Sequence, residues 1–222
     1  MAAMDLAGIR IGTWNLEGKW SIKHANLLTS FDCDLLLLTE TRRDIELPGY
    51  QLAMTNADMQ PGRAWASIAS RIGLDPLPDP HPATAMAIAG NARVCSSILP
   101  WRNAAKYSAF TGASTTEMTT DAVQAISQAM PQVWGGDWNH SLKDREYVGS
   151  LGGRSAITHA VQQLGMQVPT SALAARTPGQ LAIDHIAIPK GLSVTASVIP
   201  LTRSLSDHDA YIVEIGRADS AA

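Results

Sequence analysis

An acid and an amide stand two positions apart in the stretch Val133-Trp134-Gly135-Gly136-Asp137-Trp138-Asn139-His140. We expect residues 132–134 to close a strand and the two glycines to turn the backbone at its end. Asp137 and Asn139 would then project from a strand end, where α/β proteins usually place their chemistry. A Gly-Asp turn capped locally by Asn139 explains the stretch equally well. The rest of the chain therefore has to decide between a turn and a site.

Four further places combine an apolar strand with an acidic, amide or imidazole group. They hold Asn15 with Glu17, Glu40, Asp184, and Asp207 with His208. One strand-end acid is usually a solvated loop residue, but five such places in one chain are harder to explain in that way. Carboxylate and amide oxygens are the ligands that Mg²⁺ and Mn²⁺ prefer. A cation also offsets the repulsion between converging carboxylates, and a histidine adds a group that titrates near neutral pH.

Short strands separated by helices must position these groups. The expected strands are residues 9–14, 35–38, 50–54, 65–69, 84–89, 92–99, 181–188, 194–201 and 211–215. The first helix begins near Ser21, the second is capped by Thr119 or Thr120 and carries Met130 on its apolar face, and the third covers residues 154–164. The proline-rich residues 74–82 are expected to form an extended connection.

The composition is that of an ordinary soluble chain. It has 222 residues, of which 45% are apolar and 17% charged, and a net charge of -3. We expect one domain over residues 1–222, with flexible ends at 1–7 and 217–222. The net charge excludes a strongly basic footprint but not a local basic patch. Two cysteines without metal-site spacing indicate reduced thiols, and without a leader or spanning segment we expect a cytoplasmic protein that does not enter membranes.

Five short motifs stand in a fixed order between residues 13 and 208. They are Thr13-Trp14-Asn15-Leu16-Glu17-Gly18, Leu38-Thr39-Glu40-Thr41-Arg42, Gly136-Asp137-Trp138-Asn139, Ile183-Asp184-His185 and Ser206-Asp207-His208. Each motif is weak alone, but the ordered set resembles the endonuclease/exonuclease/phosphatase superfamily, which includes DNase I-like and exonuclease III-like enzymes. The resemblance implies a four-layer α/β sandwich, in which two mixed β-sheets pack face to face with helices outside. It also implies phosphoester hydrolysis with Mg²⁺ or Mn²⁺.

The resemblance assigns catalytic roles position by position. Asp137 resembles the group that orients or deprotonates the attacking water, and Asn139 resembles a phosphate contact. Asp184 and His208 resemble a carboxylate–imidazole pair, in which Asp184 fixes the tautomer of the histidine that binds a phosphoryl oxygen. Whether Asp137 or His208 is the general base stays open.

Metal and substrate contacts follow from the same resemblance. Glu40 resembles the principal metal ligand, Asn15 and Glu17 resemble residues that hold the metal or its waters, and Asp207 resembles a further metal-side carboxylate. Three residues are predicted substrate contacts, namely Arg42, Trp138 and His140. Arg42 would reach a phosphate, whereas Trp138 either packs beneath the site or stacks on a base.

Two positions depart from the family pattern. Ile98 stands where a His or Tyr usually contacts the phosphate, which removes a donor that His140 could replace. Asp209 follows His208 where the family often continues with another residue and Pro, which changes the local turn. His185 neighbours Asp184 on a strand, so its side chain points to the opposite face, and we interpret it as structural.

The favoured function is a phosphodiesterase or nuclease. Its substrate is a phosphoester, with nucleic acid favoured, and no obligate protein partner is evident. One alternative is a phosphatase or phosphodiesterase acting on a small molecule or a lipid headgroup, which the slightly acidic chain permits. The alternative from another class is a binding domain that kept the fold and lost activity. Ile98 favours this last hypothesis, and the otherwise intact motif set opposes it.

Overall fold

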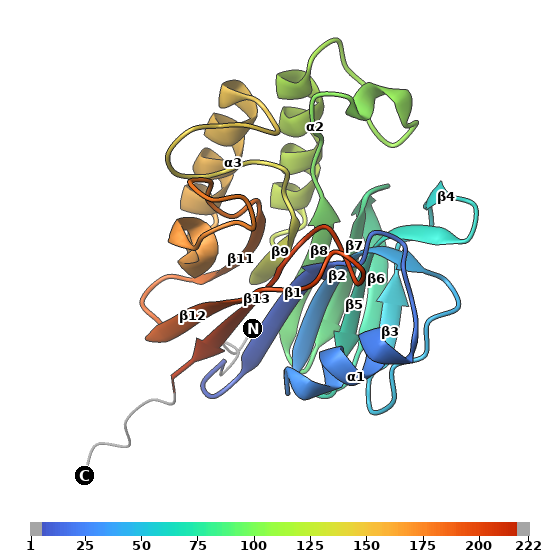
Figure 1. Ribbon diagram of the computed structural model, residues 1–222. Helices are drawn as coiled ribbons and strands as arrows, with labels where there is room; N and C mark the ends of the chain where they lie inside the picture. The colour runs from blue at the N-terminus through green and yellow to red at the C-terminus, as the bar shows by residue number, and fades with distance from the viewer. Residues whose placement is uncertain (1–5, 217–222) are drawn as a thin grey trace.

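Two β-sheets pack face to face in the computed structural model, which describes residues 6–216 (Figure 1). The first sheet is formed by β12 (Val194–Ile199), β13 (Ala210–Ile215), β1 (Arg10–Asn15), β2 (Leu35–Arg42), β5 (Arg63–Ser70) and β3 (Gln51–Met54) in that order, with β4 (Asp58–Gln60) paired to β5. The second is formed by β10 (Met166–Gln167), β11 (Asp184–Pro189), β9 (Val133–Asp137), β8 (Ala92–Ile98), β7 (Thr84–Ala89) and β6 (Asp75–His81). Both sheets are mixed, because β1 runs parallel to β2, and β8 to β9, while the other pairs are antiparallel.

Helices cover the outer faces of the two sheets (Figure 1). α1 (Ile22–Ser30) packs on the first sheet, whereas α2 (Thr115–Gln128) and α3 (Leu151–Gln163) pack side by side on the second. Two short 3-10 helices, η1 (Ala104–Lys106) and η2 (Pro169–Ala172), lie in connections. The order of helix, sheet, sheet and helices confirms the predicted four-layer α/β sandwich.

The leucine run of β2 shows how the layers are held together. Successive strand residues point to opposite faces, so Leu35 and Leu37 join the core between the sheets while Leu36 and Leu38 pack beneath α1. All four side chains are buried, and each contributes about 1.5–3 kcal/mol of hydrophobic stabilisation. This buried scaffold fixes where the polar ends of the central strands lie.

The two glycines before Asp137 lie inside β9, so the expected turn after residue 134 is wrong. Close packing explains their presence, because a Cβ on Gly135 would stand 2.5 Å from Leu37 Cδ1 of the opposite sheet. A Cβ on Gly136, whose φ is +119°, would stand 2.2 Å from the carbonyl oxygen of Ser97. The glycines therefore let the strand continue between close neighbours until it reaches Asp137.

Other element boundaries also differ from expectation, and the third helix begins at Leu151 instead of residue 154. α2 begins at Thr115, because the Ser114 hydroxyl caps it by accepting the Glu117 N–H, and the Glu117 carboxylate accepts the N–H of Ala113, one residue before the cap. Met130 lies beyond this helix and is exposed. The proline-rich residues 74–82 contain β6, which is extended as predicted but pairs with β7 at the sheet edge, where proline costs little.

The ends of the chain are described in part. The expected flexibility of residues 1–5 and 217–222 concerns positions outside the described residues, while Leu6, also placed in the flexible end, is buried in the core between the sheets. No α-helix in the described part of the chain is long and apolar enough to cross a membrane.

Candidate active site

The predicted site residues gather where strands of both sheets end. Asn15 closes β1 and Glu40 lies near the end of the parallel strand β2. Asp137 closes β9, and the register of the antiparallel pair places it opposite Asp184 at the start of β11. His208 lies in the loop that enters β13. Residues separated by up to 193 positions in sequence are thereby brought to one edge of the sandwich.

Asn15 connects the two sheets at this edge. Its side-chain amide donates to Glu40 Oε1 at 3.1 Å and to Asp137 Oδ2 at 3.0 Å. Asn15 and Asp137 are buried, whereas Glu40 keeps about a fifth of its side chain exposed. One amide therefore holds the predicted metal ligand and the predicted water-activating carboxylate close together, with Glu40 open to solvent.

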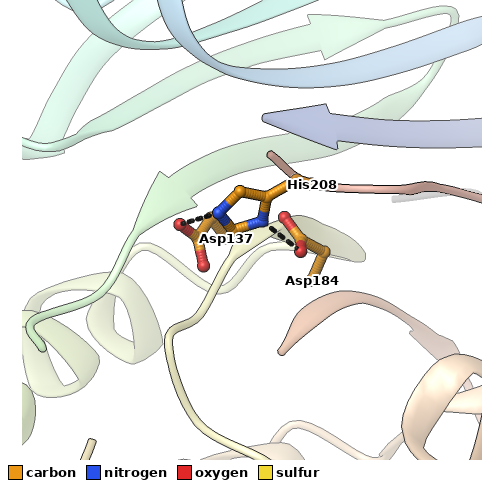
Figure 2. A group of neighbouring side chains, drawn as sticks. All are labelled: Asp137, Asp184 and His208. Atoms are coloured by element: carbon orange, nitrogen blue, oxygen red, sulfur yellow. Dashed lines mark hydrogen bonds and ion pairs between the residues drawn. The ribbon is translucent and has the colours of Figure 1, made fainter. Parts of the chain in front are cut away.

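His208 lies between two buried carboxylates, as Figure 2 shows. Its Nδ1 is 2.7 Å from Asp184 Oδ2, and its Nε2 is 4.0 Å from Asp137 Oδ2. With Nδ1–H donated to Asp184, the ring presents Nε2 toward Asp137. The predicted pairing of Asp184 with His208 is therefore present in the geometry, and its chemical role stays a prediction.

The pKa values of Asp137 and His208 depend on each other's charge and on the charge of Asp184. Burial lowers the pKa of His208, but the Asp184 and Asp137 carboxylates outweigh it and raise that pKa to about 10. Burial raises the pKa of Asp137 to about 7, with a further contribution from the Asp184 carboxylate and an opposing one from His208. His208 is therefore expected to stay protonated at neutral pH, while Asp137 exchanges its proton near neutral pH.

The raised pKa of Asp137 makes the free energy of unfolding of the metal-free protein decrease as the pH rises. The native state holds the Asp137 proton up to about pH 7, whereas the unfolded chain releases it near pH 4. The stability that this proton contributes is therefore lost as the pH rises from about 4 to about 7. For Asp137→Asn in EDTA, the free energy of unfolding relative to wild type should therefore rise by about 1–3 kcal/mol from pH 5 to pH 8. Urea unfolding at several pH values measures it, and parallel curves for the two proteins would contradict it.

A clamp that the sequence did not reveal holds the His208 loop. Arg176 donates to the carbonyl oxygens of Leu201, Ser206 and His208 and to Asp209 Oδ1 at 2.8 Å. Asp209 is the residue that departs from the family pattern, and its Oδ1 also accepts the N–H of Leu201. The arginine–carboxylate pair thus fixes the turn that the departure changes. No motif or spacing marks Arg176, which precedes Asp209 by 33 positions.

A second anchor ties the same loop to β1. The Ser206 hydroxyl donates to the carbonyl oxygen of Asn15 at 2.6 Å and accepts the N–H of His208 at 3.0 Å. The indole N–H of Trp14 also donates to the His208 carbonyl oxygen. The Ser206 side chain therefore contacts backbone atoms of Asn15 and His208, and these contacts hold His208 beside Asn15.

The predicted metal ligands Asn15, Glu17 and Asp207 are linked to one another by hydrogen bonds, and the Asn15 amide links them to Glu40. Asn15 Oδ1 accepts the N–H of Glu17. The Glu17 carboxylate accepts the N–H of Asp207 and forms an ion pair with Lys19 at 2.6 Å. Burial alone would raise the pKa of Glu17, but the hydrogen bonds from Lys19 and the Asp207 N–H bring it below its usual value. The Asp207 side chain is mostly exposed. Carboxylate oxygens are the ligands that a hard divalent cation prefers, but Glu40 Oε1 and Oε2 accept N–H groups of Asn15 and Arg63 in this structure.

Backbone strain concentrates at these residues. Six residues other than glycine have a positive φ in the described part of the chain, and three of them are Glu17 at 52°, Glu40 at 50° and Asn139 at 52°. This region is unfavourable for residues with a Cβ, and such strain often accompanies functional sites. The strain is independent of the motif resemblance and falls on residues that it singled out.

Asp137, Asp184 and His208 also have the mutual spacing of a possible metal group. His208 Nδ1 is bound to Asp184 and its Nε2 lies 4.0 Å from Asp137 Oδ2, so a cation at this group would need the ring in its neutral form. The described residues thus offer two candidate metal positions, this triad and Glu40, and the family resemblance favours Glu40.

The remaining predicted contacts have mixed outcomes. Asn139 donates its backbone N–H to Asp137 Oδ1 and its side-chain amide to the carbonyl oxygen of Leu99. Arg42 is exposed and pairs with Asp44, which leaves a phosphate contact open as a prediction. Ile98 is buried in an apolar cluster with Trp65, so the missing His or Tyr donor is replaced by core packing.

Trp138 and His140 are both buried, which contradicts the predicted substrate contact of His140 and, for Trp138, agrees with the alternative that it packs beneath the site. The Trp138 side chain is fully buried against Trp134, with ring centroids 4.2 Å apart. Buried His140 donates Nδ1–H to the Trp138 carbonyl oxygen and accepts the Ser150 N–H at Nε2. His185 is structural as expected, because its ring contacts Thr170 and the His140 carbonyl oxygen.

His140→Ala is expected to lower the free energy of unfolding by about 2–4 kcal/mol, because a cavity forms and the N–H of Ser150, the N-cap residue of α3, loses its acceptor. The KM for substrate should stay within about twofold of wild type, since the ring is buried away from any ligand. Thermal unfolding and steady-state kinetics on one preparation test this. An unchanged Tm with a raised KM would restore the substrate-binding interpretation.

The fold and site together define a DNase I-like α/β sandwich with an acid–amide–imidazole network at one edge. The model of the Endonuclease/Exonuclease/phosphatase family matches residues 12–208, and the chain belongs to that family. Membership places it among phosphoester hydrolases.

Solved structures agree with this fold. The chain is similar to the AP endonuclease LMAP from Leishmania major (12% identity, TM-score 0.68, covering 96% of this chain and 89% of that one). It is also similar to an endonuclease/exonuclease/phosphatase from Beutenbergia cavernae DSM 12333 (15%, 0.62, 97% and 74%) and to the APE2 catalytic domain of Xenopus laevis (11%, 0.58, 96% and 94%). A search of curated proteins found no match.

Proposed function

We propose that the protein is a divalent-metal-dependent phosphodiesterase or nuclease that uses water as its nucleophile. The observation that carries this proposal is the bridge made by Asn15, which joins Glu40 to Asp137 across the two sheets. Converging carboxylates repel each other unless positive charge offsets the repulsion. Arg63 supplies one such charge at Glu40 Oε2, and a bound divalent cation would supply more. His208 and Asp184 add a hydrogen-bond donor to the same edge.

In this proposal each residue has a separate task. Asp137 accepts a proton from the attacking water, and its raised pKa near 7 suits a general base at neutral pH. His208 stays protonated between Asp184 and Asp137 and donates Nε2–H to a non-bridging phosphoryl oxygen, with Asn139 as a second donor. Asp184 holds the orientation of the imidazole ring. In this proposal Asp137 is therefore the base and His208 the hydrogen-bond donor, a choice that the sequence left open.

Glu40, with Asn15, Glu17 and Asp207, would hold Mg²⁺ or Mn²⁺. A cation bound there would neutralise developing negative charge on the phosphate and lower the pKa of a bound water. The partly exposed Glu40 carboxylate supports this choice of residues, and a cation bound there would take the place of the Arg63 ion pair.

The binding-domain alternative receives less support than it did from sequence. Its main argument was Ile98, but that side chain fills an apolar cluster, while the polar network remains connected without it. A loss of catalytic function would leave no pressure to keep a strained Glu40 beside a buried Asp137.

The proposal is tested by incubating the protein with single- and double-stranded DNA, RNA and bis(p-nitrophenyl) phosphate, in Mg²⁺, in Mn²⁺ or in EDTA. Cleavage that requires a metal supports the proposal, and cleavage of an oligonucleotide identifies nucleic acid as the substrate. Hydrolysis of the small ester alone would favour the small-molecule or headgroup alternative. Tight metal-independent binding without turnover would favour the binding domain.

A further inference from the structure

A polar cavity of about 420 Å³ lies beside Glu40, outside the catalytic group. It is lined by Gly18, Arg42, Arg43, Asp44, Gln60, Pro61, Gly62 and Arg63, from the segment after β1, the end of β2 and the connection between β4 and β5. Three of these eight residues are arginines, and one is acidic. We call these eight residues the arginine pocket.

The arginine pocket is continuous with the predicted metal site. Arg63 Nη1 donates to Glu40 Oε2 at 2.9 Å, and the Gly18 N–H donates to the Glu40 carbonyl oxygen at 2.9 Å. A Cβ on Gly18 would stand 2.1 Å from the Arg63 guanidinium, so glycine is needed for the guanidinium to lie there. Arg63 would therefore stand between a ligand in the pocket and a phosphate at Glu40.

The arginines are held in place but keep hydrogen-bond capacity. Arg42 is paired with Asp44, and Arg43 is paired with Asp58 and donates to two backbone carbonyl oxygens. Among the described residues, Arg63 makes one hydrogen bond, although a guanidinium carries five N–H groups. Guanidinium groups fixed by such partners are well suited to a phosphate, whose oxygens match their fork geometry.

The lining also indicates which part of a substrate would enter. The pocket contains no aromatic residue on which a base could stack. Its donors suit phosphate oxygens, which hold a nucleic acid in position without reading its sequence. A nucleic-acid strand carries one charge per 3.4 Å of helix axis, so a neighbouring phosphate is always near the one being cleaved.

We propose that the arginine pocket binds a second phosphate of an oligonucleotide strand while the scissile phosphate lies at Glu40. The inference rests on the proposed function and specifies its substrate as a polynucleotide with phosphates on both sides of the cleaved bond. Because the pocket contacts backbone alone, recognition is independent of base sequence. A substrate with one phosphate leaves the pocket empty.

Arg42→Gln and Arg43→Gln, singly and together, test the proposal against the control Arg71→Gln. Arg71 is a surface arginine that pairs with Asp32 and lies outside the pocket lining. Each pocket variant should raise the KM for a 12-nucleotide single strand about threefold to tenfold and reduce the salt dependence of its binding by about one ion per lost contact. Turnover of bis(p-nitrophenyl) phosphate by Arg43→Gln should stay within about twofold of wild type, and Arg71→Gln should change the kinetics with neither substrate.

The outcomes separate this inference from the proposed function. If wild type hydrolyses neither substrate with any metal, the proposed function fails. If it cleaves the oligonucleotide but the double variant keeps a wild-type KM and salt dependence, the arginine pocket is not a phosphate subsite. Equal losses of activity on both substrates would show damage to Glu40 and would overturn the inference. Arginine-dependent sedimentation with phosphatidylserine vesicles, with no effect of the variants on oligonucleotide cleavage, would also overturn it.

Discussion

Replacing Asp137 with asparagine is expected to lower kcat about 10²–10⁴-fold, because the attacking water loses its proton acceptor. The substitution preserves size and keeps an oxygen that can accept from Asn15, so the KM should change little. Steady-state kinetics on bis(p-nitrophenyl) phosphate with saturating Mn²⁺ measure the effect. The same variant has a second readout, its altered pH dependence of stability in EDTA, which shows that the fold is intact when activity is lost.

A matched comparison separates the base from its neighbours. Asp184→Asn changes an equally buried carboxylate that contacts His208 instead of the water. It should lower kcat less than Asp137→Asn does, and it should lower the pKa of His208, which proton NMR of the imidazole can follow. If Asp137→Asn retained more than a tenth of wild-type kcat, Asp137 would not be the base.

Glu40→Gln is expected to raise the metal concentration for half-maximal activity at least about 10–100-fold, because the best-placed negative oxygen donor becomes a neutral amide. The variant also loses the ion pair with Arg63. A direct readout is the quenching of tryptophan fluorescence by Mn²⁺, which reports binding without turnover. Activity at very high metal should recover in part, since Asp137 and His208 remain.

Glu214→Gln is the matched control for this variant. Glu214 lies on β13, its side chain is more than half exposed, and it pairs with Arg10. Its substitution should leave both metal binding and kcat unchanged. An unchanged metal requirement in Glu40→Gln would show that the cation binds elsewhere, and the triad of Asp137, Asp184 and His208 would then have to be reconsidered as its site.

Much of the fold and the convergence of the candidate site residues were predictable because both depend on local patterns. The leucine run of β2 is apolar on both faces, which identified a strand buried between two layers. Five site residues lie at or near the ends of strands, and their motifs stand in the chain order of one family. These residues are Asn15, Glu40, Asp137, Asp184 and His208. Strand-end residues of a parallel or paired set meet at one edge of a sheet, so their convergence could be expected.

Contacts that depend on side-chain direction and distant pairing could not be predicted. His140 follows Asn139 directly, yet the positive φ of Asn139 turns the chain and His140 becomes buried. Arg63 and Arg176 stabilise Glu40 and the His208 loop from segments without any motif. The glycines of β9 have the composition of a turn, and only the opposing Leu37 side chain explains why a strand contains them.

The most direct test of the central claim is the hydrolysis of a phosphodiester by wild type and Asp137→Asn in H₂¹⁸O, with Mn²⁺ or with EDTA, followed by mass spectrometry of the released phosphomonoester. We predict that wild type with Mn²⁺ gives a product containing one ¹⁸O atom per turnover, and that EDTA or Asp137→Asn reduces product formation at least about 100-fold. Full turnover in EDTA, or product without ¹⁸O, would contradict a metal-dependent attack by water at Asp137.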